Sequence, residues 1–396
     1  MAISKKIETF LSGASWIRKM FEEGEKLRKL YGNENVYDFT LGNPDVEPPE
    51  AFKEELKKLA NTPIPGMHRY MSNAGYTETR RAIAEVLAEQ TGLTVNENNV
   101  VMTCGAGGAL NVVLKALLDQ GDEVIILSPF FVEYKFYIDN HGGIFKEVPT
   151  TSEFKLNLNA IGKALTTRTK AIIINSPNNP TGVIYDADSL AGLGELLEVH
   201  EKDTGKPVYV ISDEPYAKIA YDGLTVPNVF KYIKTSIIVT SHSKDLALPG
   251  ERIGYIAVSP KIDNNGLLIE GLVFCNRTLG FVNAPALMQR IVTVLQHVTV
   301  DISEYEEKRN ILYDNLTGLG FQMVKPQGAF YLFPKSPIPD DVEFVKKAQK
   351  HNILLVPGSG FGAPGYFRIS YCIDKKIILN SLPAFRALAE ELGMVS

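Results

Sequence analysis

The sequence has few cysteines and histidines, and this excludes the common kinds of disulfide-bonded and metal-binding protein. Its 396 residues include three cysteines, which are far apart, at Cys104, Cys275 and Cys372. They form neither a disulfide framework nor a CxxC motif, so we expect a reducing compartment. The six histidines are also scattered, and no pair has the close spacing of a helical metal site. We therefore expect no bound metal.

The chain also lacks a positive charge excess and a long apolar run. Its formal net charge is -5, which provides no basic surface for nucleic acid or an anionic membrane. No window approaches the roughly 18 uninterrupted apolar residues of a membrane helix. Residues 1–32 mix Lys, Glu and apolar residues at helical spacing, unlike a signal segment. We expect a cytoplasmic protein with neither nucleic acid nor membrane as a partner.

What the sequence does contain indicates a large globular protein. Its residues are 45% hydrophobic and 22% charged, and a chain of this length is expected to form two lobes. From about residue 50, helical segments alternate with short apolar strands, which predicts a mostly parallel sheet wrapped by helices. We expect helices at 50–60, 76–91, 107–119 and 130–141, and strands at 99–103, 123–127, 170–176, 207–213, 236–241 and 252–258.

After about residue 284 the pattern changes to that of a smaller α+β lobe. We expect one long helix over 284–315 to link the two lobes. Further strands are expected at 321–324, 329–333, 352–356 and 366–371, and further helices at 341–350 and 376–393. The predicted fold class is α/β, with residues 46–284 forming a large cofactor-binding domain. Residues 1–45 and 285–396 form a small domain with an N-terminal arm.

The residues that follow the strands are the first candidates for a site, because ligands of open parallel sheets bind beyond the carboxyl ends of the strands. Strand 99–103 runs into a turn in which Gly105, Ala106 and Gly107 present main-chain N–H groups at a helix start. Such a turn can bind a phosphate, although glycine turns are also common as plain connections. The GxGxxG dinucleotide pattern is not met, since Leu110 occupies the third glycine position.

Two more strands end in polar residues. Strand 170–176 is followed by PNNPTG, whose Asn178 and Asn179 offer amide groups, although the segment can also be a structural turn. Strand 207–213 ends in Asp213, and Tyr216 follows three residues later. An acid at this place often caps a helix, yet Asp213 and Tyr216 can both face one ligand.

The next strand ends in the segment SHSKDLALPGERIGY, which begins at Ser241 and contains Lys244. Most lysines lie on the surface. A lysine in apolar surroundings with cations nearby, however, loses solvation, and its neutral amine is then suited to Schiff-base chemistry. Ser241, Ser243 and Arg252 are anion-binding groups close to it, and Asp213 is an acid from the preceding strand. Together they fit a phosphorylated, carbonyl-bearing, basic heterocycle such as pyridoxal 5′-phosphate.

The lysine segment, with its serines, its PG pair and an arginine eight residues after the lysine, resembles the cofactor-lysine signature of class I/II pyridoxal-phosphate-dependent aminotransferases of fold type I. The resemblance extends over nearly the whole chain, with motifs in the family's order. Besides the lysine segment, these motifs are TLGNPD (40–45), RYMSNAGYTETRRAIA (69–84), TCGAGGAL (103–110), SPFFVEY (128–134), NSPNNPTG (175–182), SDEPY (212–216), PQGAFYLF (326–333) and FRISY (367–371).

The resemblance implies roles for the residues that match these motifs. Lys244 forms the Schiff base with the cofactor and moves the proton between substrate Cα and cofactor. Asp213 pairs with the pyridine nitrogen, while Tyr216 and Asn179 hydrogen-bond the phenolic oxygen. Asn178 is interpreted as structural.

The resemblance also implies how the phosphate and the ring are held, and that the protein is a homodimer with shared active sites. The phosphate-binding groups are the main chain of Gly105, Ala106 and Gly107 and the side chains of Ser241, Ser243 and Arg252. Tyr70 matches the tyrosine that reaches the phosphate of the neighbouring subunit, although a core tyrosine is the alternative. Phe131 matches the aromatic residue on the cofactor face, although Phe130 or simple core packing would give the same pattern.

For the substrate, the resemblance implies that Arg368 binds the α-carboxylate through a planar, bidentate pair. Gly42 lines that carboxylate pocket, and Asn179 lies beside it.

In members that act on dicarboxylates, the resemblance implies a second cation. This is either a lysine in the glycine-rich turn, where this chain has Gly107 and Gly108, or an arginine from the partner subunit roughly three dozen residues beyond the cofactor lysine. Arg277, 33 residues after Lys244, is near the arginine pattern. Its flanking residues differ from that pattern, so a surface or interface arginine is the alternative.

The expected activity is transfer of an amino group from an L-amino acid, either aspartate or a broad or aromatic donor, to a 2-oxo acid such as 2-oxoglutarate. A β-lyase or another elimination enzyme would use the same lysine and aspartate. A non-enzymatic regulator with an aminotransferase-like domain would need a DNA-binding domain, and only about 40 residues precede the predicted catalytic lobe.

Overall fold

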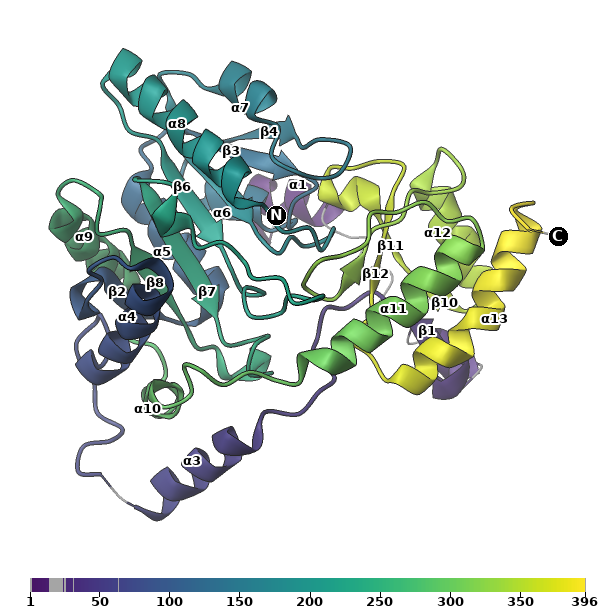
Figure 1. Ribbon diagram of the computed structural model, residues 1–396, viewed down its shortest axis with the longest axis horizontal. Coiled ribbons are helices and arrows are strands. Elements are labelled where there is room, and N and C mark those ends of the chain that lie inside the picture. Colours follow the sequence, from purple (N-terminus) through teal and green to yellow (C-terminus); the bar gives the residue numbers. More distant parts are fainter. Residues whose placement is uncertain (1, 14–23, 25, 31, 63, 396) are drawn as a thin grey trace.

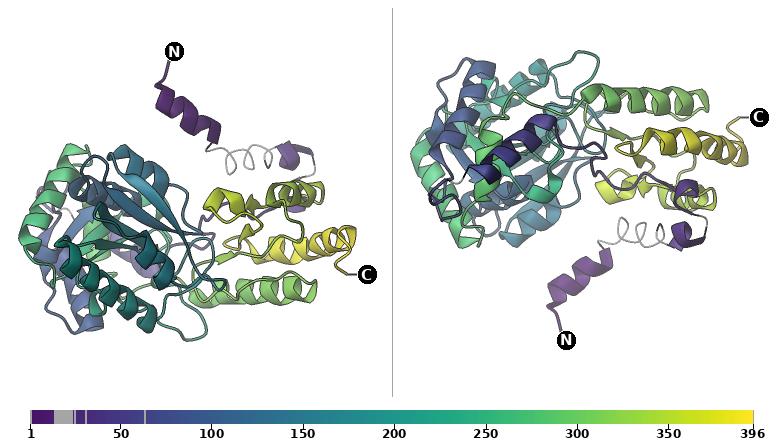
Figure 2. Two further views of the ribbon diagram at one scale, coloured as in Figure 1. Left: turned by 90° about the horizontal axis from the view of Figure 1, so that it is seen from above. Right: turned by 90° about the horizontal axis from the view of Figure 1, so that it is seen from below.

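The computed structural model describes residues 2–13, 24, 26–30, 32–62 and 64–395, and these residues form two lobes. Figure 1 shows the larger lobe around a central sheet, and the smaller lobe beside it with its helices in green and yellow. The two further views in Figure 2 show the helices of the small lobe extending away from one end of the large lobe. The domain boundaries near residues 46 and 284 stay a prediction. In the described part of the chain, no helix is long and apolar enough to cross a membrane.

The large lobe is built on a seven-stranded sheet in the order β2-β8-β7-β6-β5-β3-β4. Its strands are β2 (Val100–Thr103), β3 (Glu123–Ser128), β4 (Ile144–Pro149), β5 (Thr169–Asn175), β6 (Tyr209–Asp213), β7 (Ser236–Ser241) and β8 (Gly254–Val258). Pairing is parallel except where β8 lies antiparallel between β2 and β7. The predicted fold class, α/β with a mostly parallel sheet, is confirmed.

The strands are almost entirely apolar because both faces of the sheet are buried. In β5, Ile172 belongs to the hydrophobic core on one face and Ile173 to the core on the other, as the alternation of side chains along a strand requires. The helices of this lobe are α4 (Thr77–Thr91), α5 (Gly105–Leu117), α6 (Tyr134–Asn140), α7 (Leu158–Ala164), α8 (Ala187–Thr204), α9 (Asn265–Thr278) and α10 (Ala286–Thr293). This packing fixes the carboxyl ends of β5, β6 and β7 beside one another.

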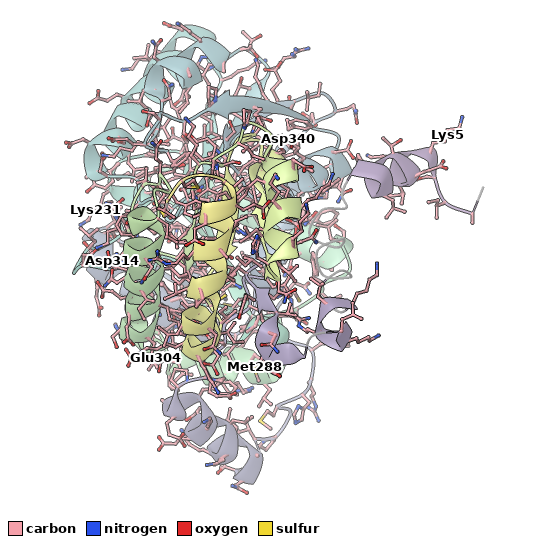
Figure 3. All side chains as sticks on the ribbon, turned by 90° about the vertical axis from the view of Figure 1, so that its right-hand side faces the viewer. Lys5, Lys231, Met288, Glu304, Asp314 and Asp340 are labelled. Carbon is pink, nitrogen blue, oxygen red and sulfur yellow. The ribbon has the colours of Figure 1, made fainter. Side chains whose placement is uncertain are left out.

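The small lobe has its own hydrophobic core and short strands. Strands β11 (Val356–Pro357), β12 (Phe367–Ser370) and β9 (Tyr331–Leu332) form one antiparallel sheet, and β1 (Tyr37–Asp38) pairs with β10 (Ile353–Leu354). Helices α11 (Ile302–Gly318), α13 (Lys375–Glu391) and α12 (Asp341–Lys350) lie side by side as one layer in Figure 3, where Glu304 and Asp314 mark α11. Beneath that layer, β12 and β9 supply residues to the site.

The predicted long helix over 284–315 is wrong. The structure has two helices there, α10 and α11, separated by an irregular segment at 294–301. That segment is rich in β-branched residues, which favour the helix less, and Asp301 caps α11 by accepting a hydrogen bond from the Ser303 N–H at 2.9 Å. Val300 also donates its N–H to the Asp245 carbonyl at 2.8 Å, so the segment is fastened to the turn that carries Lys244.

Other differences are smaller. Residues 321–324 are irregular instead of forming a strand, and the helix expected over 130–141 begins at Tyr134. The N-terminal arm falls partly on residues 14–23, which lie outside the described residues. Helix α1 (Lys5–Gly13) contacts α6, since the rings of Phe10 and Phe136 are 4.9 Å apart. A further helix, α3 (Glu50–Asn61), precedes the helices of the large lobe in the chain.

Candidate active site

A cavity of about 190 Å³ lies where the carboxyl ends of β5, β6 and β7 meet the start of α5. Its lining includes the predicted site residues Ala106, Gly107, Phe131, Asn179, Asp213, Tyr216, Ser241, Ser243 and Arg252. These residues come from five separate segments of the chain, and the sheet topology brings them together. The cavity stands at the edge of the sheet where α/β proteins bind their ligands.

One part of this cavity is suited to an anion. Helix α5 begins at Gly105, so its first N–H groups have no partner within the helix and attract negative charge. A side chain at Gly105, whose φ is +73°, would come within 2.8 Å of the Arg252 guanidinium, which shows how closely that cation approaches the helix start. The Ser241 hydroxyl donates to the Ser243 hydroxyl at 3.0 Å. Helix start, hydroxyls and guanidinium together form a site for a phosphate group.

Asp213 lies in the same cavity and retains one unpartnered oxygen. Its Oδ2 accepts a hydrogen bond of 2.6 Å from the Tyr134 hydroxyl, whereas Oδ1 is enclosed without a partner. The side chain is 5% exposed, and burial raises the pKa of Asp213 to about 7, against the opposing effect of the Tyr134 hydrogen bond. Since enclosed polar atoms are normally paired, this oxygen fits the protonated ring nitrogen of a bound heterocycle.

The raised pKa of Asp213 predicts a dependence of stability on pH in the cofactor-free protein. Because the folded state holds the proton up to about pH 7 while the unfolded chain releases it near pH 4, stability decreases as pH rises between these values. Asn cannot ionise, so the free energy of unfolding of Asp213→Asn should exceed that of the natural protein by about 4 kcal/mol at pH 8 and be about the same at pH 4.

Urea unfolding of both cofactor-free proteins at the two pH values measures this difference. The neighbouring Glu214 is present in both proteins. Burial raises its pKa to about 7 and the Asp213 charge adds to this rise, so the measured difference includes the repulsion between the two carboxylates. A difference between the two proteins that stays constant with pH would show that Asp213 does not carry the shift.

Lys244 lies next to the cavity, in the turn after β7. Its Nζ donates a hydrogen bond of 2.7 Å to the carbonyl of Gly42 and stands 5.5 Å from the centre of the Phe330 ring. Burial lowers the pKa of Lys244 to about 8, and the positive charges of Arg368 and Arg252 act in the same direction. A large fraction of this lysine is therefore the neutral amine near pH 8, the form that is a nucleophile and a base.

Behind Lys244, a buried cluster of charged residues holds its turn in place. The Asp245 carboxylate is 3.2 Å from Lys218 Nζ and 3.1 Å from His242 Nδ1. The alternation of side chains explains this arrangement, since Ser241 and Ser243 point to the cavity while His242 between them points to the other side. Sequence reasoning missed the cluster, although this alternation was a signal for it.

Arg368, on β12 of the small lobe, is 4% exposed and faces the region of Lys244. Its guanidinium donates to the Asn179 side-chain oxygen at 3.0 Å and to the Thr40 carbonyl at 2.5 Å. Nε is enclosed without a partner. The guanidinium carbon lies 4.7 Å from the centre of the Tyr331 ring. A buried guanidinium with a free N–H is suited to bind a carboxylate.

Gly42 completes this carboxylate pocket because a larger residue would not fit. A Cβ at this position would come within 1.9 Å of the Tyr331 hydroxyl, and that hydroxyl is 2.8 Å from the hydroxyl of Tyr216. Tyr216 therefore links the cavity to the pocket around Arg368. Asn178 has a structural role, since its oxygen accepts hydrogen bonds from the main chain and the hydroxyl of Thr181 at 3.1 and 2.9 Å.

Two predicted site residues lie away from this cavity. Tyr70 is 89% exposed, and Arg277 is exposed on α9 with its guanidinium 5.4 Å from the Phe274 ring. Both were predicted to act in the site of a neighbouring subunit, so their roles stay predictions. Among the described residues, no group of three or more His, Cys, Asp and Glu side chains is placed to hold a metal ion.

Sequence reasoning missed several residues of the site. Tyr134, which bonds to Asp213, closes the quoted motif SPFFVEY, and Asn175 opens NSPNNPTG. Asn175 donates to the Asp213 carbonyl at 2.8 Å and accepts from the Asn179 N–H at 2.6 Å. Tyr137, one turn beyond Tyr134 on α6, also lines the cavity. Their position within or beside the quoted motifs was the available signal.

Comparison with known proteins gives a consistent result. The family described as aminotransferase class I and II matches residues 34–380. A probable aspartate aminotransferase of Methanocaldococcus jannaschii is 32% identical over 360 residues, covering 88% of this chain and 92% of that protein. Aromatic-amino-acid aminotransferase 2 of Thermococcus litoralis is 31% identical over 409 residues, covering all of both chains. The crystal structure of an amino transferase from Eubacterium rectale superposes with a TM-score of 0.96 at 39% identity, over 99% of each chain.

Proposed function

Because this chain belongs to the class I and II aminotransferase family, we propose that it transfers the amino group of an L-amino acid to a 2-oxo acid with pyridoxal 5′-phosphate bound in the cavity described above. The observation that supports this cofactor most directly is the unpartnered Asp213 oxygen in a cavity that also contains an anion site. A phosphate and a basic ring nitrogen are the two groups that this arrangement requires, and the cofactor has both.

When bound, the cofactor supplies an aldehyde that captures the substrate amino group and a protonated ring that accepts electrons from Cα. Ser241, Ser243, Arg252 and the first N–H groups of α5, at Ala106 and Gly107, hold the phosphate. Phe131 covers one face of the ring, and Asp213 keeps the proton on the ring nitrogen. Tyr216 and Asn179 donate hydrogen bonds to the ring oxygen.

Lys244 is the base at the substrate. Its amine, which the lowered pKa of about 8 makes available, would take the proton from substrate Cα and return it at C4′ of the cofactor. Arg368 binds the α-carboxylate, with Gly42 leaving room for it. This orientation places the Cα–H bond, rather than the bond to the carboxylate, next to Lys244.

The protein acts as a homodimer in this proposal. Tyr70 reaches the phosphate in the neighbouring subunit, and Arg277 is the candidate for binding a distal carboxylate there. Tyr70 is 89% exposed, so its ring is accessible to a neighbouring subunit. The similarity to a probable aspartate aminotransferase and to an aromatic-amino-acid aminotransferase supports aspartate or an aromatic amino acid as donor.

The experiment that tests this function follows the absorbance of the cofactor-loaded protein while single L-amino acids are added without a 2-oxo acid. Transamination predicts that the lysine-bound form of the cofactor disappears, a stable pyridoxamine form appears and one equivalent of 2-oxo acid is released. Recovery of the original band while ammonia accumulates would instead show an elimination enzyme. No change with any amino acid would contradict both reactions.

A further inference from the structure

Glu133 lies at the start of α6, between two residues that line the active-site cavity. Phe131 precedes it by two residues and Tyr137 follows it by four. Tyr137 donates its N–H to the Glu133 carbonyl at 3.0 Å, so the two residues are one helical turn apart and their side chains lie on the same face. Glu133 is the N-cap residue of α6, yet its side chain makes no capping hydrogen bond. The carboxylate therefore does not serve as the cap of α6.

The charge of Glu133 acts on residues of both the cofactor cavity and the carboxylate pocket around Arg368. Burial and the Glu133 charge raise the pKa of Tyr137, on the cofactor side, to about 12. On the carboxylate side, burial raises the pKa of Tyr331 to about 12, with a smaller contribution from Glu133. Burial also raises the pKa of Glu133 itself, against the opposing effects of a hydrogen bond with its own main chain and, to a smaller extent, of the Arg368 charge. The carboxylate thus lies within electrostatic range of Arg368, where the substrate α-carboxylate binds in the proposed function.

One oxygen of this carboxylate has no partner in the described chain. Glu133 Oε2 is enclosed and makes no hydrogen bond, and an enclosed carboxylate oxygen without a donor is unfavourable. Arg368 makes no hydrogen bond to this oxygen, and its two terminal nitrogens donate instead to Asn179 and Thr40. A bound substrate can supply a donor, and the part of an amino acid beyond its α-carboxylate and amino group is its side chain.

We propose that Glu133 is a specificity-determining residue that favours substrates whose side chain donates a hydrogen bond and disfavours substrates with a second carboxylate. This inference rests on the proposed function, since it takes Arg368 as the anchor of the α-carboxylate. An amide, hydroxyl or ammonium group of the substrate donates to Glu133 Oε2, whereas a distal carboxylate meets a like charge. Glu133 therefore opposes the attraction that Arg277 of a partner would exert, and favours a hydroxyl-bearing aromatic donor over aspartate.

The test uses pairs of unreactive ligands that differ only in this distal group. Succinate has two carboxylates, and succinamate has one carboxylate and one amide of nearly the same shape. Calorimetry gives their dissociation constants for the cofactor-loaded natural protein, for Glu133→Gln and for Glu147→Gln. Glu147→Gln is the matched control, because it also removes one negative charge close to α6. Glu147 lies on β4, and its carboxylate is 3.4 Å from Lys135 of α6.

The natural protein and Glu147→Gln should bind succinamate at least about tenfold more tightly than succinate, and Glu133→Gln should reduce this ratio by about tenfold or more. In turnover, the kcat/KM ratios of glutamine to glutamate and of asparagine to aspartate should fall in the same way. If Glu133→Gln leaves the ratio of the succinate and succinamate dissociation constants unchanged, the inference is wrong, even if both ligands bind more weakly. The binding ratios could change as expected while no amino acid gives a 2-oxo acid. That result would support the specificity role of Glu133 and contradict the proposed function.

Discussion

Replacing Lys244 with alanine is expected to lower the turnover number for transamination by at least about 10⁴-fold. The amine of Lys244 is the base placed beside the anchored substrate, and burial gives it a pKa of about 8, close to the pH at which the enzyme would be assayed. Lys244 Nζ already lies 2.7 Å from the Gly42 carbonyl, at the edge of the carboxylate pocket. Single-turnover kinetics, with 2-oxo acid formation as the signal, measures the effect.

A small amine in solution should restore part of the rate of Lys244→Ala, because it can enter the space of the missing side chain and move the same proton. It should not affect Lys202→Ala, a control at an exposed lysine of α8. The melting temperature of each variant shows whether the protein remains folded. Full activity in Lys244→Ala would contradict the assignment of the base.

Replacing Arg368 with leucine should lower kcat/KM for amino acids by about 10²- to 10⁴-fold, which corresponds to the roughly 3–5 kcal/mol of a buried, hydrogen-bonded ion pair that loses one partner. The arginine is nearly fully buried and its Nε has no partner, so a substrate carboxylate bound there is shielded from water. Arg368→Lys keeps the charge without the planar pair of donors, and should recover a minor part of the loss.

The control for Arg368 is a substrate without an α-carboxylate. Steady-state kinetics with an amino acid and with the amine that lacks this group separates a loss of carboxylate binding from damage to the fold. The arginine variant should lose most of its activity toward the amino acid and little of the weak activity toward the amine. Equal losses for both compounds would mean that Arg368 supports the fold instead of binding the substrate.

The sheet and much of the candidate site could be predicted from the sequence because they depend on local patterns. Strands such as 236–241 are apolar on both faces, and where such segments alternate with helices this pattern favours the buried strands of a parallel sheet. Residues placed directly after strands, including Asp213, Ser241 and Ser243, meet at the cavity because parallel strands end at the same edge of a sheet.

The break between α10 and α11 and the partners of several site residues could not be predicted, because they depend on contacts between segments far apart in the sequence. The interruption between α10 and α11 is held by a hydrogen bond from Val300 to the carbonyl of Asp245, in the turn of Lys244. Tyr134 pairs with Asp213 across the sheet, and Glu133 approaches Arg368 from another lobe. No periodicity marks such residues, because each acts through a partner that the fold brings near.

The most direct test of the account is to find where the protein binds its cofactor. The natural protein is loaded with pyridoxal 5′-phosphate, reduced with borohydride and digested, and its peptides are weighed by mass spectrometry. If Lys244 binds the cofactor, the peptide containing Lys244 gains the mass of one reduced phosphopyridoxyl group and peptides with other lysines do not. A label on another lysine, or no label on any peptide, would contradict binding at Lys244.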